Sequence, residues 1–460
     1  MTFFQQLKKE HLLIIGFGYR TGLSTANYLI SKGIKVSISD SKSEKDLKPL
    51  KDQLTGPIHQ FYYGKQSSSQ LSEIDRVILS PGVPRAIPLI QEALRRGIPV
   101  TSEIELAFLL CHPRMVIGIT GTDGKTTTIT LLHNLLKEEF KVFVGGNIGI
   151  PFISFVDDVD DRSIVLLELS SYQLEDMPLF NCHIASILNV SEDHLDRYDH
   201  FQDYFKAKRN IFKNQTDKDY AILNLDDPHY EATAQGVNSQ ILVFSKDNTK
   251  ADVYIKDSKV LFKGKELVSL VDIKLKGVHN LENVLAAVVI AKLAGSSDSV
   301  IQKALNDFKG LPHRNELIDT VGGVDYINDS KGTTTNSVIK SLLSQEKPVI
   351  LMMGGRDKGL NFVELKPHIE KRVKGLILFG EAKEKIDREI QFPPTYLVND
   401  LEEAFHRAVQ MAKEGDSVLL SPACTSFDQY ISYEKRGDHF RELVKSLHTK
   451  EPYDRDSTTL

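Results

Sequence analysis

The chain has 460 residues, which at about 150 residues per domain predicts about three domains. Its 57 basic and 62 acidic residues give a formal net charge of −5, which argues against a general nucleic-acid or anionic-membrane binder. Hydrophobic residues are 41% and charged residues 26% of the chain, a mixture that excludes wholesale disorder. The cysteines, Cys111, Cys182 and Cys424, form neither a disulfide framework nor a zinc spacing. Since no export signal or membrane span is visible in the pattern, we expect a cytoplasmic protein.

The first block of the chain alternates strand and helix patterns and begins with a βαβ unit. Its apolar runs predict strands at 12–15, 36–39, 77–79 and near 100, with helices at 22–32, 88–96 and 103–110. The run Ser102-Glu103-Ile104-Glu105 resembles a capping pattern that opens the last of these helices. We therefore place the first domain boundary near residue 103.

Two further blocks continue the alternation. The middle block has predicted strands at 115–120, 164–169, 185–190 and 221–225, helices at 126–139 and 281–294, and a small antiparallel section at 241–275. The last block begins near residue 310 and has predicted strands at 349–353, 376–379 and 417–420, with helices at 334–344, 363–373, 381–388 and 401–413. This alternation predicts an α/β fold with largely parallel sheets.

The strongest local pattern is the run Gly118-Ile119-Thr120-Gly121-Thr122-Asp123-Gly124-Lys125-Thr126-Thr127, between a predicted strand and a predicted helix. Glycines let backbone N–H groups turn toward phosphate oxygens, and the helix N-terminus adds partial positive charge. Lys125 would neutralise phosphate charge, and the Thr126 hydroxyl would face Mg²⁺. The first glycine of the usual phosphate-loop spacing comes one residue early, at Gly118. We nevertheless predict a phosphate loop here.

A second glycine run, Gly16-Phe17-Gly18-Tyr19-Arg20-Thr21-Gly22, also joins a strand to a helix. Asp40 ends the next strand, where an acid that binds a ribose would lie. The third glycine comes one residue late for the dinucleotide fingerprint. From the loop alone, a dinucleotide enzyme and a Rossmann-like domain for another nucleotide diphosphate are equally consistent.

Polar residues cluster after the strands of the middle block, where ligands of open α/β sheets collect. Glu168 lies near the end of a strongly apolar strand, so its carboxylate favours a role in metal binding over a surface position. His194 follows the next strand and could bind a metal or a substrate phosphate. Lys206, Lys208 and Arg209 follow on a helical pattern, where a solvated basic face is the plain alternative.

Three polar loops follow strands of the last block, and together they suggest one binding face. They comprise residues 326–333, 354–359 and 421–428. Arg356 and Lys358, in the middle loop, could bind a carboxylate substrate. His313-Arg314 lies at the expected domain junction.

Taken in order, these runs resemble the motifs of the ATP-dependent Mur ligases of bacterial cell-wall synthesis. The similarity covers essentially the whole chain, and its motif forms are most similar to those of the D-glutamate-adding members. It is carried by the phosphate-loop run, Gly146-Asn147-Ile148-Gly149, Glu168-Leu169-Ser170-Ser171-Tyr172-Gln173-Leu174, Asn189-Val190-Ser191-Glu192-Asp193-His194-Leu195-Asp196-Arg197, His279-Asn280 with Asn283, Leu311-Pro312-His313-Arg314, Asn328-Asp329-Ser330-Lys331 and Leu420-Ser421-Pro422-Ala423-Cys424-Thr425-Ser426-Phe427-Asp428.

The resemblance implies three domains: a Rossmann-like UDP-sugar domain (1–103), a central P-loop ATPase-like domain for ATP (104–310) and a C-terminal Rossmann-like domain for the amino acid (311–460). The implied reaction adds D-glutamate to UDP-N-acetylmuramoyl-L-alanine. The L-alanyl carboxylate would attack the γ-phosphate of ATP, and the D-glutamate amine would then attack the resulting acyl phosphate. Two anions meet in the first step, which explains the need for cations.

The resemblance also assigns site residues. ATP would be bound by Gly121, Thr122, Asp123, Gly124, Lys125, Thr126, Thr127, Asn280, Asn283, Arg314 and Asp329. The UDP-sugar would be bound by Tyr19, Arg20, Asp40, Ser41, Lys42, Gly82, Asn147, Ser170 and Gln173. D-Glutamate would be bound by Thr333, Lys358, Ser426 and Phe427. Two Mg²⁺ ions would be held by Thr126, Glu168, His194 and a carbamylated Lys208. The catalytic set implied is Lys125, Glu168, His194 and Lys208.

We thus expect small-molecule substrates, no nucleic-acid or membrane partner, and a monomer. Three alternatives are weighed against this hypothesis. Folylpolyglutamate synthase shares the ATP chemistry but lacks the N-terminal UDP domain that the Gly16 loop and Asp40 indicate. A non-catalytic nucleotide sensor is disfavoured because Lys125, Glu168 and His194 are all present. An NAD-dependent oxidoreductase would leave the Lys125 loop unexplained.

Overall fold

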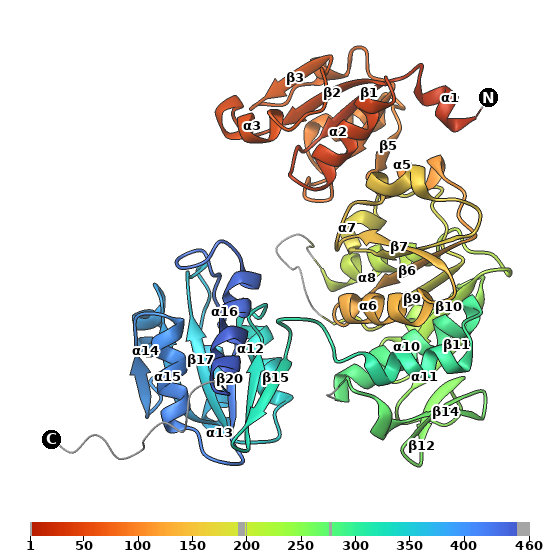
Figure 1. Cartoon of the computed structure of the whole chain (residues 1–460). Helices are drawn as coiled ribbons and strands as arrows, with labels where there is room; N and C mark the ends of the chain where they lie inside the picture. The colour runs from red at the N-terminus through yellow and green to blue at the C-terminus, as the bar shows by residue number, and fades with distance from the viewer. Residues whose placement is uncertain (1, 192–197, 199, 276–277, 449–460) are drawn as a thin grey trace. The chain divides into compact units, whose positions relative to one another are not determined.

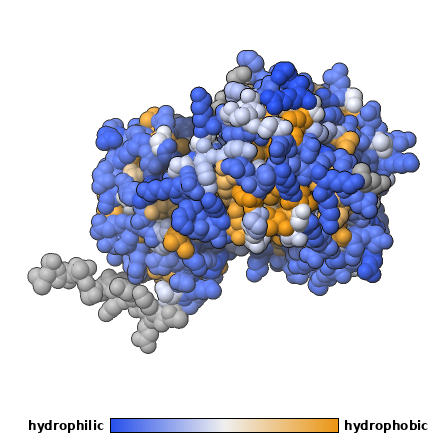
Figure 2. Space-filling view, turned by 90° about the horizontal axis from the view of Figure 1, so that it is seen from above, coloured by the Kyte–Doolittle hydropathy of each residue, from blue (hydrophilic) through white to orange (hydrophobic). Residues whose placement is uncertain are grey.

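The structure is a computed structural model, and it describes residues 2–191, 198, 200–275 and 278–448. The chain divides into two compact units, residues 1–308 and 309–460 (Figure 1). Across the described ranges, no helix combines the length and the apolar character that a membrane span needs. In the space-filling view most of the visible face is hydrophilic, and hydrophobic residues gather in one central area (Figure 2).

The first unit holds two sheets, and the first of them has five parallel strands in the order β3-β2-β1-β4-β5. Successive side chains of the central strand β1 alternate between two apolar layers, which explains why all of its residues are buried. Helices α2 and α3 pack on one face, and α4 packs on the other. The elements are β1 (His11–Ile15), β2 (Lys35–Asp40), β3 (Gln60–Tyr63), β4 (Arg76–Leu79), β5 (Val100–Ser102), α1 (Phe3–Leu7), α2 (Thr21–Ser31), α3 (Glu44–Lys51), α4 (Pro88–Arg95) and η1 (Ser68–Leu71).

Helix α5 (Glu103–Leu110) connects the two sheets of this unit, and its predicted cap is confirmed. The Ser102 side chain accepts a hydrogen bond from the Glu105 backbone N–H. The carboxylate of Glu103 accepts a hydrogen bond of 2.6 Å from the Ile153 backbone N–H, in η2 (Phe152–Asp158). One continuous apolar core therefore runs from α2 and β1 through α5 into the second sheet.

The second sheet has nine strands in the order β14-β13-β12-β11-β10-β9-β6-β8-β7. The strands are β6 (Met115–Thr120), β7 (Lys141–Gly146), β8 (Ser163–Glu168), β9 (Ile184–Ile187), β10 (Tyr220–Asn224), β11 (Gln240–Ser245), β12 (Val253–Lys256), β13 (Lys259–Phe262) and β14 (Lys265–Ser269). The helices are α6 (Lys125–Leu136), α7 (Ser171–Leu174), α8 (Phe201–Arg209), α9 (Tyr230–Ala234), α10 (Val278–Ala294) and α11 (Asp298–Asp307), with α6 and α10 side by side (Figure 1). Three short helical turns complete the unit: η2, η3 (Asn210–Phe212) and η4 (Leu270–Asp272).

The antiparallel section predicted at 241–275 is only partly right. β11 pairs in parallel with both β10 and β12, so it extends the main sheet. Only the pairs β12–β13 and β13–β14 are antiparallel. Exposed and buried residues alternate along part of β11 because this strand lies outside the buried centre of the sheet. Gln240 and Ile241, for example, are exposed.

The second unit has a six-stranded sheet in the order β15-β16-β20-β17-β18-β19, parallel except for the β15–β16 hairpin. Helices α12, α13 and α14 pack on one face, while α15 and α16 pack on the other. The elements are β15 (Glu316–Val321), β16 (Val324–Asn328), β17 (Val349–Gly354), β18 (Val373–Phe379), β19 (Thr395–Leu397), β20 (Ser417–Leu420), α12 (Thr335–Leu343), η5 (Val363–Leu365), α13 (Lys366–Arg372), α14 (Lys383–Ile390), α15 (Leu401–Met411) and α16 (Tyr433–Ser446). The mostly parallel sheets confirm the predicted α/β fold class.

Candidate active site

The predicted phosphate loop connects the central strand β6 to the N-terminus of α6. Gly121 and Gly124 have φ angles of +151° and +80°, which non-glycine residues avoid. A side chain at Gly124 would also collide with the side chain of Asn283. Gly118 has a different function: it lies inside β6, and a Cβ there would meet the Sγ of Cys182. The irregular spacing is thereby explained, because Gly118 is a packing residue and the loop proper begins at Gly121.

Two lysines from distant parts of the chain converge on the carbonyl oxygen of Gly121. Lys125 Nζ donates to it at 2.7 Å and also donates to the Thr122 carbonyl at 2.8 Å. Lys208 Nζ, from α8, donates to the Gly121 carbonyl at 2.9 Å and lies 4.4 Å from the centre of the Tyr204 ring. Lys208 is only 2% exposed, so the alternative of a solvated basic face is wrong for this residue, although Lys206 is exposed.

Glu168 ends β8 beside this loop and is 2% exposed. One carboxylate oxygen accepts a hydrogen bond of 2.8 Å from the Thr126 hydroxyl, and the other accepts one of 3.0 Å from the Asn147 amide. A buried carboxylate beside a hydroxyl provides the hard oxygen ligands that Mg²⁺ prefers. The donor set therefore fits Mg²⁺. The remaining predicted metal ligand, His194, lies outside the described residues.

Polar side chains surround the loop on two sides. The Asp123 N–H donates to the Asn189 side chain at 2.9 Å, and Thr122 lies 3.2 Å from the Tyr204 hydroxyl. From α10, Asn283 accepts a hydrogen bond from Thr128 at 3.2 Å and donates one to the Asn280 side chain at 3.1 Å. The structure thus brings together the predicted ATP-binding residues of the first unit, Gly121, Thr122, Asp123, Gly124, Lys125, Thr126, Thr127, Asn280 and Asn283.

The other glycine loop, between β1 and α2, is held by a carboxylate. Asp40 accepts hydrogen bonds from the Phe17 N–H at 2.7 Å and from the Lys42 N–H at 2.9 Å, and it is 8% exposed. Gly16 has φ +88° and packs against Val83. Gly22 allows α2 to approach the loop backbone, since a Cβ there would lie 2.7 Å from the Gly16 carbonyl oxygen. Asp40 therefore orders the loop in the structure.

Arg20 connects this loop to the second sheet of the same unit. Its guanidinium donates to the carbonyl oxygens of Asn147 at 3.0 Å and Gly146 at 3.1 Å. Ser170 and Gln173 form a reciprocal capping box at the start of α7, which is a structural role for both residues. The other predicted UDP-sugar residues, Tyr19, Ser41, Lys42 and Gly82, are exposed around the loop.

In the second unit, three loops follow the carboxyl ends of β16, β17 and β20. Lys358 Nζ lies 3.3 Å from the Thr333 hydroxyl, so two of the predicted D-glutamate residues lie together. Ser426 is buried, whereas the Phe427 side chain is 60% exposed. Arg356 forms a bidentate ion pair with Glu381, with both contacts at 2.9 Å. Arg356 is therefore engaged with a neighbouring acid in this structure, and Lys358 lies nearer Thr333.

Asp329, at the carboxyl end of β16, is a buried acid of this unit, with 6% exposure. It accepts hydrogen bonds from the Ser421 hydroxyl at 2.7 Å and from the Asn315 N–H at 3.2 Å. Burial raises the pKa of Asp329 to about 6, while the hydrogen bond from Ser421 opposes that shift. Arg314, predicted together with Asp329, is exposed.

Arg436 is not among the predicted site residues, yet it is fully buried on α16 and holds the three loops together. Its guanidinium donates to Ser330 Oγ at 3.0 Å and to the carbonyl oxygens of Ser330 at 2.9 Å, Cys424 at 3.1 Å and Gly354 at 3.4 Å. Burial lowers the pKa of Arg436 to about 10. A glycine inside an otherwise helical run, at 437, was the available sign that this helix packs closely.

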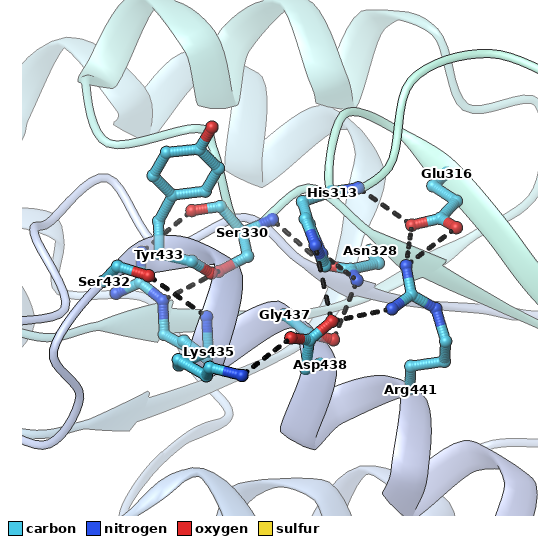
Figure 3. A network of polar contacts seen from close by, with 11 residues as sticks. His313, Glu316, Asn328, Ser330, Ser432, Tyr433, Lys435, Gly437, Asp438 and Arg441 are labelled. Atoms are coloured by element: carbon cyan, nitrogen blue, oxygen red, sulfur yellow. Dashed lines mark hydrogen bonds and ion pairs between the residues drawn. The ribbon is translucent and has the colours of Figure 1, made fainter.

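The same helix is anchored to the beginning of the unit by a polar network around His313 (Figure 3). Asn328 donates to the Gly437 carbonyl at 3.0 Å, and its amide nitrogen lies 3.1 Å from His313 Nδ1. Arg441 binds both Glu316 oxygens at 3.0 Å, and Glu316 also accepts a hydrogen bond from the His313 N–H. His313, which the sequence placed at a domain junction, thus has a structural role within this unit.

Three family models match the chain in succession. They are the Mur ligase MurD-like N-terminal domain at residues 10–102, the Mur ligase middle domain at 119–291 and the Mur ligase glutamate ligase domain at 313–424. Together they cover well over half of the chain. The chain therefore belongs to the Mur ligase family, as the sequence motifs predict.

Curated relatives show which members of this family the chain is similar to. The chain is 41% identical to the UDP-N-acetylmuramoylalanine–D-glutamate ligase of Koribacter versatilis, over 97% of this chain and 99% of the relative. It is 42% identical to the ligase of the same name from Geotalea daltonii, over 96% and 98% of the two chains. Among solved structures, MurF from Acinetobacter baumannii shares the fold, with a TM-score of 0.59, 17% identity and coverage of 97% and 98%.

Proposed function

We propose that the protein is an ATP-dependent ligase that adds D-glutamate to UDP-N-acetylmuramoyl-L-alanine through an acyl-phosphate intermediate, in the cytoplasmic stage of peptidoglycan synthesis. The observation that carries the proposal is the convergence of Lys125, Lys208, Thr126 and Glu168 around one glycine loop. The full-length similarity to D-glutamate ligases supports the choice of amino acid.

The loop after β6 is proposed to bind the phosphates of ATP. Its glycines turn backbone N–H groups toward an anion, and α6 adds the positive end of its dipole. Lys125 would exchange its two carbonyl acceptors for γ-phosphate oxygens, which removes charge repulsion between ATP and the attacking carboxylate. Asn280 and Asn283, on the adjacent helix, are proposed to contact the adenine.

Thr126 and Glu168 are proposed to hold one Mg²⁺, and His194 with Lys208 a second. When bound, these ions would neutralise phosphate charge and polarise the transferring group. An ammonium cannot ligate a cation, so the proposal requires Lys208 to carry a carbamate. Lys208 is only 2% exposed, and a bound cation beside it would compensate the negative charge of the carbamate. Lys208 would then be an anionic side chain opposite Glu168.

The remaining substrates are assigned to other loops. The UDP-sugar is proposed to bind at the β1–α2 loop through Tyr19, Arg20, Asp40, Ser41, Lys42, Gly82, Asn147, Ser170 and Gln173. In the second unit, D-glutamate is proposed to bind through Thr333, Lys358, Ser426 and Phe427, and ATP is proposed to contact Arg314 and Asp329. The domains proposed for the three substrates are 1–103, 104–310 and 311–460, in a monomer.

A substrate comparison tests the proposed reaction. The protein would be mixed with ATP, Mg²⁺ and UDP-N-acetylmuramoyl-L-alanine, and phosphate release measured with D-glutamate, L-glutamate, L-lysine or diaminopimelate. We expect release that depends on D-glutamate. Equal release with L-lysine, or none with any amino acid, would overturn the assignment.

The carbamate has its own test. Lys208→Ala should abolish ligase activity, and bicarbonate or small carboxylic acids should restore part of it by replacing the missing anion. Lys206→Ala, two residues away on the exposed face of α8, is the matched control and should remain active. A fully active Lys208→Ala protein would contradict the role of the carbamate.

A further inference from the structure

A second group of potential metal ligands lies in the first sheet, at the end opposite the β1–α2 loop. His11 begins β1, His59 immediately precedes β3, and Glu73 lies shortly before β4. One ligand atom from each residue lies within 4.8 Å of the others. Because these strands are parallel, their amino ends meet at one edge of the sheet, away from the carboxyl ends where substrates bind.

His11 has the environment of a metal-binding histidine rather than of a packed one. Its ring is 6% exposed, and Nε2 lies 2.9 Å from the Ser37 hydroxyl. The other ring nitrogen, Nδ1, is buried without a hydrogen-bond partner among the described residues. A buried polar atom without a partner destabilises the folded protein. Histidines that bind metals usually engage one ring nitrogen with a neighbouring acceptor and leave the other for the ion.

The three side chains of this group already lie close together. The His59 ring meets the His11 ring edge to face, with centroids 4.7 Å apart. His59 and Glu73 are exposed, so both side chains can rotate toward a shared ion.

We propose that His11, His59 and Glu73 bind a divalent transition-metal ion of the Zn²⁺ class, with His11 Nδ1 as the buried ligand. Two imidazoles and one carboxylate are a typical three-ligand set for such an ion, and water would complete a tetrahedron. Bonds of about 2.0–2.1 Å place tetrahedral ligand atoms about 3.4 Å apart, so the exposed ligands need to move inward by roughly an ångström.

The ion would connect three segments at the base of the sheet. The backbone already fixes their positions: the His59 N–H donates to the Val36 carbonyl at 2.8 Å, and His11 and Asp75 exchange hydrogen bonds of 2.8 and 2.9 Å. Lys35 would compete with the metal ion for Glu73, since its ammonium lies 3.3 Å from the Glu73 carboxylate. Metal binding has to displace this exposed ion pair, which is worth little in water.

Cobalt is the probe for the test, because tetrahedral Co²⁺ absorbs visible light. The full-length protein, freed of metals with a chelator, would be titrated with Co²⁺ in excess Mg²⁺, which occupies sites with only oxygen ligands. We expect one equivalent of tetrahedral Co²⁺ that Zn²⁺ displaces. His59→Gln and Glu73→Gln, both at exposed positions, should each weaken binding at least about tenfold. Lys35→Gln should strengthen it.

The matched control is His406→Gln, which removes an exposed histidine 3.8 Å from Glu402 in the second unit. It should bind Co²⁺ as the unchanged protein does. The proposal is overturned if the unchanged protein shows no tetrahedral Co²⁺ spectrum, or if His59→Gln and Glu73→Gln bind Co²⁺ with unchanged affinity.

Discussion

The two glycine loops of the first unit occupy equivalent places, after a central strand and before a helix, yet opposite charges hold them. At the β1–α2 loop, the Asp40 carboxylate accepts a hydrogen bond from the Phe17 backbone N–H. In the β6–α6 loop, the ammonium groups of Lys125 and Lys208 donate to backbone carbonyls. The charged side chain at the first loop thus binds a backbone donor, whereas those at the second loop bind a backbone acceptor.

The difference follows from what each loop is proposed to bind. When a carboxylate attacks a triphosphate, two anions approach each other. Positively charged side chains therefore have to be able to move onto the phosphate oxygens. A diphosphate that is only held in place needs N–H groups in a fixed geometry. Similar glycine patterns therefore give different sites, and the charged residues around them decide which.

The largest effect is expected from Lys125→Ala. If the Lys125 ammonium moves from the loop carbonyls to the γ-phosphate, its removal should lower kcat about 10²–10³-fold, because stabilisation of the transferring phosphate is lost. The measurement is steady-state phosphate release at saturating substrates. Lys137→Ala, at the exposed end of the same helix, should leave kcat unchanged. A fall of less than about tenfold for Lys125→Ala would remove the proposed contrast between the loops.

The next largest effect concerns packing, in which the two loops should be alike. Gly22→Ala and Gly118→Ala place a Cβ against the loop backbone and against Cys182, respectively, so each should destabilise the protein by about 1–3 kcal/mol. Gly18→Ala is the control, because nothing lies within 4 Å of its added Cβ. Urea denaturation followed by circular dichroism measures all three; equal stabilities would contradict the packing role.

Asp40→Asn should give a loss of similar size, through hydrogen bonding rather than packing. An asparagine keeps one acceptor but turns an N–H₂ group toward a backbone N–H, so about 1.5–3 kcal/mol of stability should be lost. The KM for the UDP-linked substrate should rise while that for ATP stays unchanged. Asp52→Asn, in an exposed pair with Lys48, should change stability by no more than about 0.5 kcal/mol. An equal rise in both KM values would contradict a role of Asp40 that is confined to the β1–α2 loop.

The smallest effect is a pH dependence of the folding stability that arises from Glu103, near Arg20. Burial raises the pKa of Glu103 to about 7, although Arg20 and the hydrogen bond from Ile153 oppose the shift. The folded protein therefore binds this proton more tightly than the unfolded chain, whose glutamates are ionised above pH 6. Between pH 6 and pH 8 the folded state should lose about 1.4 kcal/mol. Glu103→Gln should remove that part of the change of stability with pH, as measured by calorimetric melting at several pH values. An unchanged dependence on pH would refute this role of Glu103.

Sequence patterns located the central strands well, because buried parallel strands are short apolar runs that end at glycine or polar residues. β1, β6 and β8 were placed within a residue or two of their observed bounds. Edge elements were missed or misjudged: β3 and β7 lie at sheet edges and mix polar with apolar residues. The orientation of β11 was wrong because alternation shows exposure but not pairing direction.

The same limit applies to the site. Phosphate-loop residues were found because their chemistry requires neighbours along the chain, as for Lys125 and Thr126. The burial of Lys208 and its approach to Gly121, 87 positions earlier, leave no local pattern. Gly118 was mistaken for an irregular loop residue, since only the fold reveals the contact with Cys182.

Arg436 has a consequence for how the second unit acquires its loops. Its hydrogen bonds reach back 106, 82 and 12 positions along the chain, to Ser330, Gly354 and Cys424. These contacts can form only after the last helix has been synthesised and has docked, since loop closure over such separations comes late in folding. A chain that ended at residue 424 would retain every predicted D-glutamate residue except Ser426 and Phe427, but not the arginine that sets their geometry. The ordering of this face is therefore linked to completion of the chain.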